Sequence, residues 1–334
     1  MSVPSGAVSG AAWPLEGETV LVTGAAGFIG SHLVDALLER GARVRAFDNL
    51  ATGRKENLSP SAERIEFLEA DIRDAGACRE ACRGVSVVFH QAALGSIPRS
   101  MKDPATSLAV NVGGTANVFA GARDAGVRRV VYASSSSVYG DSPRLPRTEG
   151  QEGDVLSPYA LSKVMDEDLA SLFGRCYGME LIGLRYFNVY GPRQDPEGPY
   201  AAVIPRFFKA YLSGEAPVIY GDGGQSRDFT FVDDAVEANL LAAVAPPPAC
   251  GRAYNVAGGR QTSVNDLARA VRQVVGGGPE PRNEAPRAGD VLHSAADLSL
   301  SEVSLGYRPR VGLAEGLAKS VEHYQSVARA RARG

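Results

Sequence analysis

The chain of 334 residues lacks the features that mark several large classes of protein. It has no apolar run of about 18 residues, the length that a membrane-spanning helix needs. Lys and Arg number 35 against 38 Asp and Glu, so no basic excess favours a nucleic-acid partner. Hydrophobic residues make up 44% of the chain, which is enough for a sizeable core. We therefore expect a globular protein that binds neither membrane nor nucleic acid.

Cysteine and histidine are also scarce, with four of each. Cys78 and Cys82 lie four residues apart on an expected helix, but no other metal-ligating residues accompany them. We interpret both as packing residues and expect no metal site. The small number of cysteines and their irregular spacing predict reduced thiols and a cytoplasmic location.

Two regions of different character follow a short leader. Residues 1–16 have no basic segment and no long apolar run, and their small residues predict a mobile leader rather than a signal peptide. From 17 to 186, short apolar runs alternate with helical patterns, which predicts an α/β domain with a doubly wound parallel sheet. The expected strands are 19–23, 43–47, 65–70, 85–90, 130–133 and 181–186, and the longest expected helices are 28–40, 105–125 and 158–174.

The composition changes after residue 186. Residues 187–229 are rich in glycine, proline and aromatic side chains, which predicts a lid-like region. A helix and a strand within 230–258 are expected to return to the first domain. Residues 187–229 and 259–330 then form a smaller, mixed α/β domain at the C-terminal side, which we expect to bind substrate.

A glycine-rich segment joins the first strand to the first helix. Its glycines are Gly24, Gly27 and Gly30, with Phe28 and Ile29 between the last two. This G-x-x-G-x-x-G spacing is a variant of the dinucleotide-binding pattern, in which a tight turn and a helix N-terminus receive the pyrophosphate. Its position between a strand and a helix predicts a Rossmann-type, NAD-binding domain over 17–186.

Further cofactor contacts are expected where later strands end. Asp48 ends the second strand, where a carboxylate binds a ribose 2′-hydroxyl and repels a 2′-phosphate, so NAD is favoured over NADP. The alternative is that Asp48 only begins a turn with Asn49. The remaining candidates follow the third and fourth strands and are Asp71, Ile72, Gln91, Ala92 and Ala93.

A Tyr–Lys pair lies at the start of the helix over 158–174. Ser157 is a suitable N-cap, and Tyr159 and Lys163 lie four residues apart on one helix face. A nearby cation favours the phenolate form of a tyrosine, which can then act as a general base. The pair alone is typical of an exposed helix face. Ser134–Ser137 follow the fifth strand, where hydroxyl groups point toward the ligand crevice of an α/β fold, and proton transfer on an alcohol is the expected chemistry.

Four segments in this order carry a family resemblance. They are T-G-A-A-G-F-I-G, S-S-S-x-V-Y-G, S-P-Y-A-x-S-K and R-Y-F-N-V-Y-G-P-R, and they span about residues 18–330. The chain resembles the extended short-chain dehydrogenase/reductases and, within them, the nucleotide-sugar 4-epimerases. The segments at 91–100 and 193–198 are most similar to UDP-N-acetylglucosamine 4-epimerases.

The resemblance implies a role for each catalytic candidate. Tyr159 would be the base, and Lys163 would bind the nicotinamide ribose and support the phenolate. Ser135 would contact the sugar O4, because it lies four residues before Tyr139, as the family residue does; Ser136 and Ser137 remain alternatives. Tyr186 would border the cofactor.

The resemblance also implies contacts to a UDP-sugar. Asn188 would lie beside the diphosphate, which Arg227 and Arg287 would bind, while Ser294 would border the sugar. The other implied substrate residues are Ser96 near the sugar, Ala202, Val203, Ile204 and Tyr220 along the uracil, and Asp290 next to Arg287.

The expected reaction is NAD-dependent 4-epimerisation through a 4-keto sugar. Related 4,6-dehydratases need an acid pair after the family serine, and decarboxylases carry a glutamate there, but Ser136 and Ser137 occupy these positions. The small Ser294 stands where glucose-restricted enzymes carry tyrosine, which predicts UDP-N-acetylglucosamine and UDP-N-acetylgalactosamine, with UDP-glucose and UDP-galactose also turned over.

Two alternatives remain open. One is a UDP-glucuronic acid 4-epimerase, with Ser135–Ser137 meeting the carboxylate, although Asp195 argues against it. The other is a non-catalytic NAD sensor, which the intact Tyr–Lys pair disfavours. The resemblance further implies a homodimer formed through a four-helix bundle of the helices at 105–125 and 158–174, in which Val118, Leu169 and Leu172 are interface candidates that could equally be core.

Overall fold

Seven parallel strands form the central sheet of the protein, and their order is β3-β2-β1-β4-β5-β6-β11. The computed structural model describes residues 13–197, 201–286 and 292–331. The sheet strands are β1 (Thr19–Thr23), β2 (Arg43–Asp48), β3 (Ile65–Glu69), β4 (Val87–His90), β5 (Arg129–Ser135), β6 (Glu180–Tyr186) and β11 (Arg252–Val256). The prediction of a Rossmann-type doubly wound sheet is confirmed.

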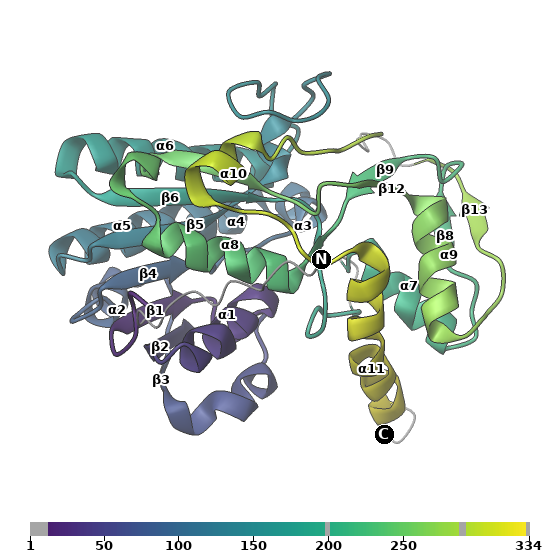
Figure 1. Ribbon diagram of the computed structural model, residues 1–334, viewed down its shortest axis with the longest axis horizontal. Coiled ribbons are helices and arrows are strands. Elements are labelled where there is room, and N and C mark those ends of the chain that lie inside the picture. The colour runs from purple at the N-terminus through teal and green to yellow at the C-terminus, as the bar shows by residue number, and fades with distance from the viewer. Residues whose placement is uncertain (1–12, 198–200, 287–291, 332–334) are drawn as a thin grey trace, which may run out of the picture.

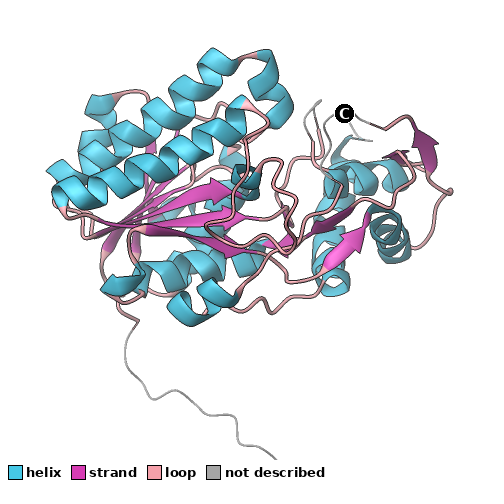
Figure 2. Cartoon of the chain, turned by 90° about the horizontal axis from the view of Figure 1, so that it is seen from above, coloured by secondary structure: helices cyan, strands magenta, loops and turns pink. Residues whose placement is uncertain are grey.

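Helices cover both faces of this sheet (Figures 1 and 2). Side chains alternate along a strand, so neighbouring residues enter different cores. Val20 and Val22 pack with the helices of one face, whereas Leu21 packs with those of the other. The first face carries α1 (Phe28–Glu39), α8 (Val232–Val244) and α10 (Ser299–Leu305), and the second carries α2 (Ala75–Ala81), α5 (Gly114–Asp124) and α6 (Pro158–Tyr177).

A smaller lobe lies to one side of the sheet (Figure 2). Its core is built around aromatic side chains such as Tyr190, Phe207 and Phe208. Its elements are β7 (Val189–Tyr190), α7 (Val203–Leu212), β8 (Val218–Tyr220), β9 (Ser226–Asp228), β10 (Thr230–Phe231), β12 (Gln261–Ser263), α9 (Val264–Val275), β13 (Arg282–Glu284) and α11 (Leu313–Arg331). Its short strands form three two-stranded ribbons, as described by the pairs β10–β7, β12–β9 and β13–β8.

Two predicted boundaries are wrong. The leader cannot reach residue 16, because Leu15 is fully buried in the first core and residues 14–17 form a turn. The helix α10 lies within 259–330, yet it packs against β11 and α8, so it belongs to the first domain rather than the second.

The predicted helix over 105–125 is interrupted. The structure has α3 (Ile97–Lys102), α4 (Pro104–Leu108), a π-helical turn at Ala109–Gly113 and then α5. Within the π-helical turn, Asn111 donates to Ser162 Oγ at 3.0 Å and accepts from the Leu94 amide at 2.8 Å. The turn therefore places Asn111 between the loop after β4 and the start of α6, close to the Tyr–Lys pair.

The remaining secondary structure agrees with the sequence in most details. Cys78 and Cys82 are buried packing residues, as predicted. Burial raises the pKa of each thiol to about 12, which leaves both protonated at neutral pH. None of the described helices is long and apolar enough to cross a membrane.

Candidate active site

A cavity of about 1030 Å³ opens where the sheet strands end. It is lined by residues that follow β1, β2, β4, β5 and β6, at the carboxyl edge of the sheet, and by residues of the smaller lobe. Ligands of open α/β sheets bind in this crevice. First-domain residues and several of the substrate candidates thus border one continuous space.

The glycine-rich turn forms the floor of the cavity where β1 enters α1. Gly24 has φ of +67°, and a Cβ atom there would lie 2.7 Å from the Ala92 amide nitrogen. A Cβ atom on Gly30 would lie 2.0 Å from the Gly24 carbonyl oxygen, so α1 can approach the turn only with glycine. No side chain caps the N-terminus of α1 at Gly27, and its first amides can bind an anionic pyrophosphate.

Asp48 is held by the turn itself. Its Oδ2 accepts from the Ala26 amide at 2.9 Å, and its Oδ1 accepts from the Leu50 amide at 2.8 Å. Burial raises the pKa of Asp48, and these two amides offset part of that effect. Each carboxylate oxygen keeps a lone pair toward the cavity, which suits a ribose diol and opposes a phosphate. The donor set therefore fits NAD, as the sequence predicts.

Asp71 is the one cofactor candidate in the described chain that does not line the cavity. Its carboxylate is bound by the guanidinium of Arg73 at 2.7 and 3.0 Å and by Asn49 at 2.8 Å. These contacts, led by that of Arg73, hold the pKa of Asp71 far below its usual value. Asp71 therefore orients Asn49 and Arg73, both of which line the cavity.

Gln91 and Tyr186 line the cavity, but their polar groups point inward. The Tyr186 hydroxyl donates to Gln91 Oε1 at 3.1 Å and accepts from Asn239 Nδ2 at 2.7 Å, while Gln91 Nε2 donates to Asn239 Oδ1 at 3.0 Å. Asn239 is fully buried on α8. These side chains form a closed triangle, so it is the Tyr186 ring and the backbone near Gln91 that can face the cofactor.

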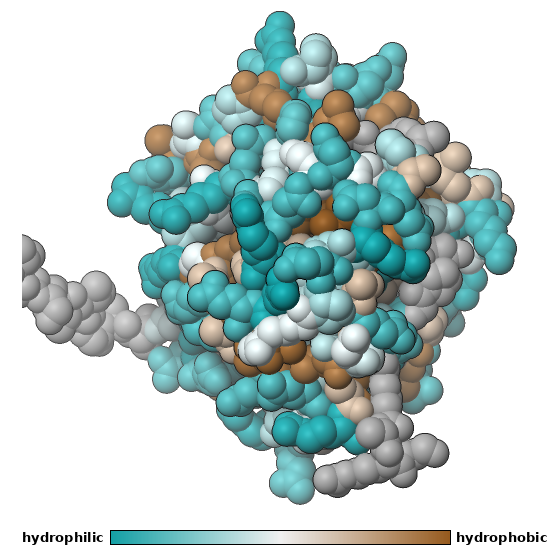
Figure 3. Space-filling model, turned by 90° about the vertical axis from the view of Figure 1, so that its right-hand side faces the viewer, coloured by the Kyte–Doolittle hydropathy of each residue, from teal (hydrophilic) through white to brown (hydrophobic). Residues whose placement is uncertain are grey.

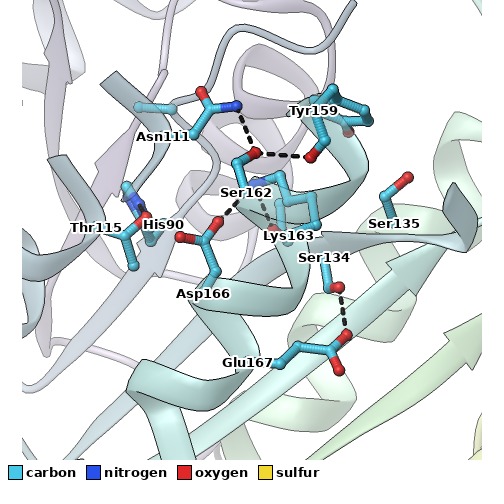
Figure 4. Close-up of polar contacts among 12 residues, drawn as sticks. His90, Asn111, Thr115, Ser134, Ser135, Tyr159, Ser162, Lys163, Asp166 and Glu167 are labelled. Carbon is cyan, nitrogen blue, oxygen red and sulfur yellow. Dashed lines mark hydrogen bonds and ion pairs between the residues drawn. The ribbon is translucent and has the colours of Figure 1, made fainter. Parts of the chain in front are cut away.

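Tyr159 and Lys163 project from the first turns of α6 into the cavity (Figure 4). Ser157 caps this helix by accepting from the Ala160 amide at 3.1 Å, as predicted. The Tyr159 amide donates to Ser100 Oγ, which fixes the helix start against α3. Lys163 Nζ donates to the Ala133 carbonyl at 2.9 Å and to Asp166 Oδ2 at 3.0 Å.

The four serines after β5 take different positions. Ser134 and Ser135 are the last residues of β5, and their side chains point in different directions (Figure 4). Ser134 donates to Glu167 Oε1 at 2.5 Å and is buried. Ser135 Oγ accepts from the amide of Ser137 at 3.1 Å and from its hydroxyl at 3.0 Å. With its acceptor positions used, the Ser135 hydroxyl is left to donate its own proton into the cavity.

The implied substrate residues divide into two groups. Those that line the cavity are Ser96, Ser135, Ser136, Ser137, Asn188, Ala202, Arg227 and Ser294. Val203, Ile204 and Tyr220 do not line it, and Ile204 is buried in the core of the smaller lobe. Arg287 and Asp290 lie outside the described residues.

Several residues of the site were missed in the sequence. Arg147 lines the cavity. Its backbone is held there by an isolated β-bridge to Ala296, which is far away in the sequence. Asn111, in the π-helical turn, and Asn239, in α8, hold site residues from segments that carry no motif. The i, i+3 spacing of Lys163 and Asp166 was a usable signal, because such residues are neighbours on a helix.

This cavity, with a glycine turn, a strand-end aspartate and a Ser–Tyr–Lys set, defines a dinucleotide-dependent enzyme of the short-chain dehydrogenase/reductase type. The sequence profile of the NAD dependent epimerase/dehydratase family matches residues 20–257. The chain belongs to this family.

Relatives of known name agree in fold and length. A UDP-glucose 4-epimerase of Mycolicibacterium smegmatis is 43% identical over 312 residues, which are 92% of this chain and 98% of that one. A UDP-N-acetylglucosamine 4-epimerase of Methanobrevibacter ruminantium, solved with UDP-N-acetylmuramic acid, is 38% identical with a TM-score of 0.89 and covers 93% of this chain and 99% of its own. A UDP-glucose 4-epimerase of Thermus thermophilus, solved with NAD, is 38% identical with a TM-score of 0.83 over 92% and 99%.

These similarities confirm the predicted family, the epimerase class of enzyme and NAD as the cofactor. The roles of single residues and the choice of sugar stay predictions.

Proposed function

We propose that the protein interconverts the C4 epimers of UDP-sugars, with UDP-N-acetylglucosamine and UDP-N-acetylgalactosamine as substrates and UDP-glucose and UDP-galactose also accepted. One observation carries the proposal. Tyr159, Lys163, Ser135 and Ser294 line the same cavity as the glycine turn and Asp48. A hydroxyl of a sugar can therefore meet the proton-transfer groups and the cofactor within one space.

In this mechanism Tyr159 takes the proton of the sugar 4-hydroxyl and later returns it. Ser135 donates a hydrogen bond from its hydroxyl to O4 and keeps its proton, since its acceptor positions are used by Ser137. Lys163 places a positive charge on the same helix face as the phenol. NAD, when bound, would accept a hydride from C4 of the sugar and later return it. The resulting 4-keto sugar turns over while the UDP stays bound, and reduction of its other face gives the epimer.

The residues beside Ser135 restrict this chemistry to inversion. Elimination or decarboxylation needs an additional acid next to the sugar. Ser136 and Ser137 line the cavity at these positions, and a serine hydroxyl is not acidic enough for that role.

Fewer of the described residues line the end of the cavity where we expect the nucleotide of the substrate to bind. Asn188 has φ of +38° and donates to the Asp228 carbonyl at 2.9 Å, which holds it at the cavity. Arg227 and Ala202 also line the cavity at the smaller lobe. A guanidinium suits a diphosphate, so we place the UDP at this end.

Sugar choice rests on Ser294, which lines the cavity next to the segment that bridges to Arg147. A small side chain leaves room for a 2-acetamido group. Replacing Ser294 by Tyr should lower kcat/KM for the acetamido sugars by about a hundredfold or more, because the phenol fills that room, and should spare UDP-glucose and UDP-galactose. Ser294→Ala is the matched control and should keep both activities. Equal loss of both substrate classes in Ser294→Tyr contradicts this assignment.

UDP-glucuronic acid is the second candidate substrate, and Arg147 favours it. Arg147 is only 7% exposed and lines the cavity, and its Nη1 donates to the Ser142 carbonyl. Within the described chain no carboxylate pairs with it. A buried guanidinium at a sugar cavity suits a carboxylate on the sugar. Asp195, which seemed to oppose this substrate, pairs with Arg54 at 2.8 Å and does not line the cavity.

The two candidates separate in one comparison. If UDP-glucuronic acid is the substrate, Arg147→Met should lower its kcat/KM roughly thirtyfold or more, the cost of removing one partner of a buried charge pair. If the acetamido sugars are the substrates, the wild-type protein turns them over faster than UDP-glucuronic acid, and Arg147→Met changes them little.

We further propose a homodimer in which α6 of each copy meets the other. Leu161, Met165 and Leu172 are 41%, 39% and 44% exposed on one face of α6, and Met101 of α3 is 62% exposed beside them. Of the earlier interface candidates, Val118 is core, whereas Leu172 is on this surface. The face of the molecule seen in Figure 3, on the side of the smaller lobe, carries both hydrophilic and hydrophobic residues.

A further inference from the structure

Lys163 forms a buried ion pair within its own helix. Its Nζ lies 3.0 Å from Asp166 Oδ2, and the two side chains are 4% and 2% exposed. The same Nζ donates to the carbonyl of Ala133 in β5 at 2.9 Å. An ammonium has three donors, so two are used and one is left for the cavity, which Lys163 lines.

The presence of Asp166 needs a reason. Removing two charges from water is costly, and apolar residues often replace a buried ion pair without loss of stability. Asp166 also weakens the positive charge that the proposed mechanism requires beside Tyr159. Its contribution must therefore lie in what it does to Lys163.

The burial of Lys163 explains why a counter-ion is needed beside it. A buried ammonium without a counter-ion gives up its proton readily. Burial alone would lower the pKa of Lys163, but the charges of Asp166, Tyr159 and Glu167, led by that of Asp166, together offset this, and the pKa of Lys163 is raised. Burial also raises the pKa of Asp166, and the charge of Lys163 opposes that effect, so each charge of the pair supports the other.

We propose that Asp166 is a positioning residue, which keeps the buried Lys163 charged and directs its remaining donor at the cavity beside Tyr159. This proposal rests on the roles proposed above for Tyr159 and Lys163.

The surroundings of Asp166 offer no other cation within the described chain. His90 of β4 bonds to Thr115 Oγ1 of α5 at 3.0 Å and to Thr23 Oγ1 at 2.7 Å. Burial first, and then the charge of Lys163, lower the pKa of His90 to about 3, so it is neutral. The other titratable groups that face Asp166 are Tyr132 of β5, and Glu167 of its own helix, whose carboxylate binds Arg185.

Asp166 also has one weakly bonded oxygen. Its Oδ1 is buried and has no hydrogen bond of normal length, although the Thr115 hydroxyl is near enough to lower the pKa of Asp166. A carboxylate held with one oxygen weakly bonded is costly, which is consistent with a group kept for its charge rather than for its hydrogen bonds. An amide in its place would fill the same volume and remove only the charge.

Asp166→Asn should therefore move the alkaline limb of the pH–rate profile toward acid. Lys163 without its counter-ion deprotonates at lower pH, so the rate falls at a lower pH than in the wild type. This limb should shift by about one pH unit or more, the usual effect of a charge 3.0 Å away.

The measurement is kcat against pH for the NAD-bound enzyme with a UDP-hexose that the wild type turns over. Asp168→Asn is the matched control, because Asp168 is an exposed acid two residues further along α6. Asp168→Asn should reproduce the wild-type profile. An Asp166→Asn enzyme that is folded, holds NAD and has the wild-type profile overturns the proposal. An inactive wild type would instead refute the proposed function.

A second pair of variants covers the case in which Asp166→Asn does not fold. An unpaired buried ammonium would then be the cause, and removing it should restore folding. Lys163→Met with Asp166→Asn should unfold near the wild-type temperature. If the double variant is as unstable as Asp166→Asn alone, Asp166 acts through a partner other than Lys163 and the proposal is wrong.

Discussion

The Asp48 carboxylate accepts a 2.9 Å hydrogen bond from the backbone amide of Ala26, which ties the end of β2 to the glycine-rich turn. One aspartate thereby fixes the glycine-rich turn. In the proposed NAD site this turn would face the pyrophosphate and the free lone pairs of Asp48 would face a ribose, so the two parts of the site would be a single hydrogen-bonded unit.

Replacing Asp48 by Asn tests this unit. The amide retains an acceptor for Ala26 but loses the negative charge, and charge-assisted hydrogen bonds contribute about 1.5–3 kcal/mol. Affinity for NAD should fall roughly tenfold to a hundredfold, and discrimination against NADP should weaken. Calorimetric titration of NAD-depleted protein with both cofactors measures this. Unchanged affinity for NAD and unchanged rejection of NADP would show that Asp48 only shapes the turn.

We expect replacements of the serines at and just after the end of β5 to differ in their effect on kcat. Ser135→Ala should lower kcat about a hundredfold, in the range of a lost donor to a reacting oxygen. Ser136→Ala is the matched control and should lower it less than tenfold. Steady-state kinetics with one UDP-hexose decides between them. A larger loss for Ser136 would move the O4 contact to that residue.

The burial of the Asp228 carboxyl group should make the stability of the protein depend on pH. It is 1% exposed, and burial raises its pKa to about 6, against a weak 3.4 Å contact from the Ala296 amide. A raised carboxyl pKa means that the folded state binds the proton more tightly than the unfolded state. The stabilisation is full below the unfolded value near 3.8 and is lost as the pH rises through about 6.

Asp228→Asn should remove this dependence. Relative to the wild type, its free energy of unfolding should rise by up to about 3 kcal/mol between pH 4 and pH 7, at 1.36 kcal/mol for each unit of pKa. Urea unfolding of both proteins across this range provides the comparison. Parallel curves for the two proteins would contradict the buried-charge account.

Leu172 tests the proposed dimer. Leu172→Glu places a charge in the apolar stripe of α6 and should shift a wild-type dimer toward monomer. Val303→Glu is the control, because Val303 is 86% exposed on α10, away from the stripe. Light scattering after size-exclusion chromatography gives the masses. A monomeric wild type, or equal masses for both variants, rules this interface out.

The first domain was predictable because its signals are local. The strand Thr19–Thr23 contains the apolar run Val20–Val22, and the spacing of Gly24, Gly27 and Gly30 directly after it is a local pattern. The smaller lobe was not predictable in detail, since β7 and β10 hold two residues each and pair across segments far apart in the chain.

The residues of the candidate site also divide into those that local sequence motifs predict and those that depend on contacts between distant segments. Tyr159, Lys163 and Ser135 belong to motifs, and the structure brings all three to the cavity. Arg147 has no motif, because its place depends on the pairing of its backbone with Ala296. The inward hydrogen bonds of Tyr186 and Gln91 depend on Asn239, a helix residue that no pattern in the sequence connects to them.

The most direct test of the central claim is incubation of the purified protein with UDP-N-acetylglucosamine, with its bound NAD quantified and none added. We predict that UDP-N-acetylgalactosamine forms until the two epimers reach a constant ratio, and that the reverse reaction reaches the same ratio. The same experiment with UDP-glucose should give UDP-galactose. If no UDP-hexose of such a panel is interconverted while NAD is bound, the protein is not a UDP-sugar 4-epimerase.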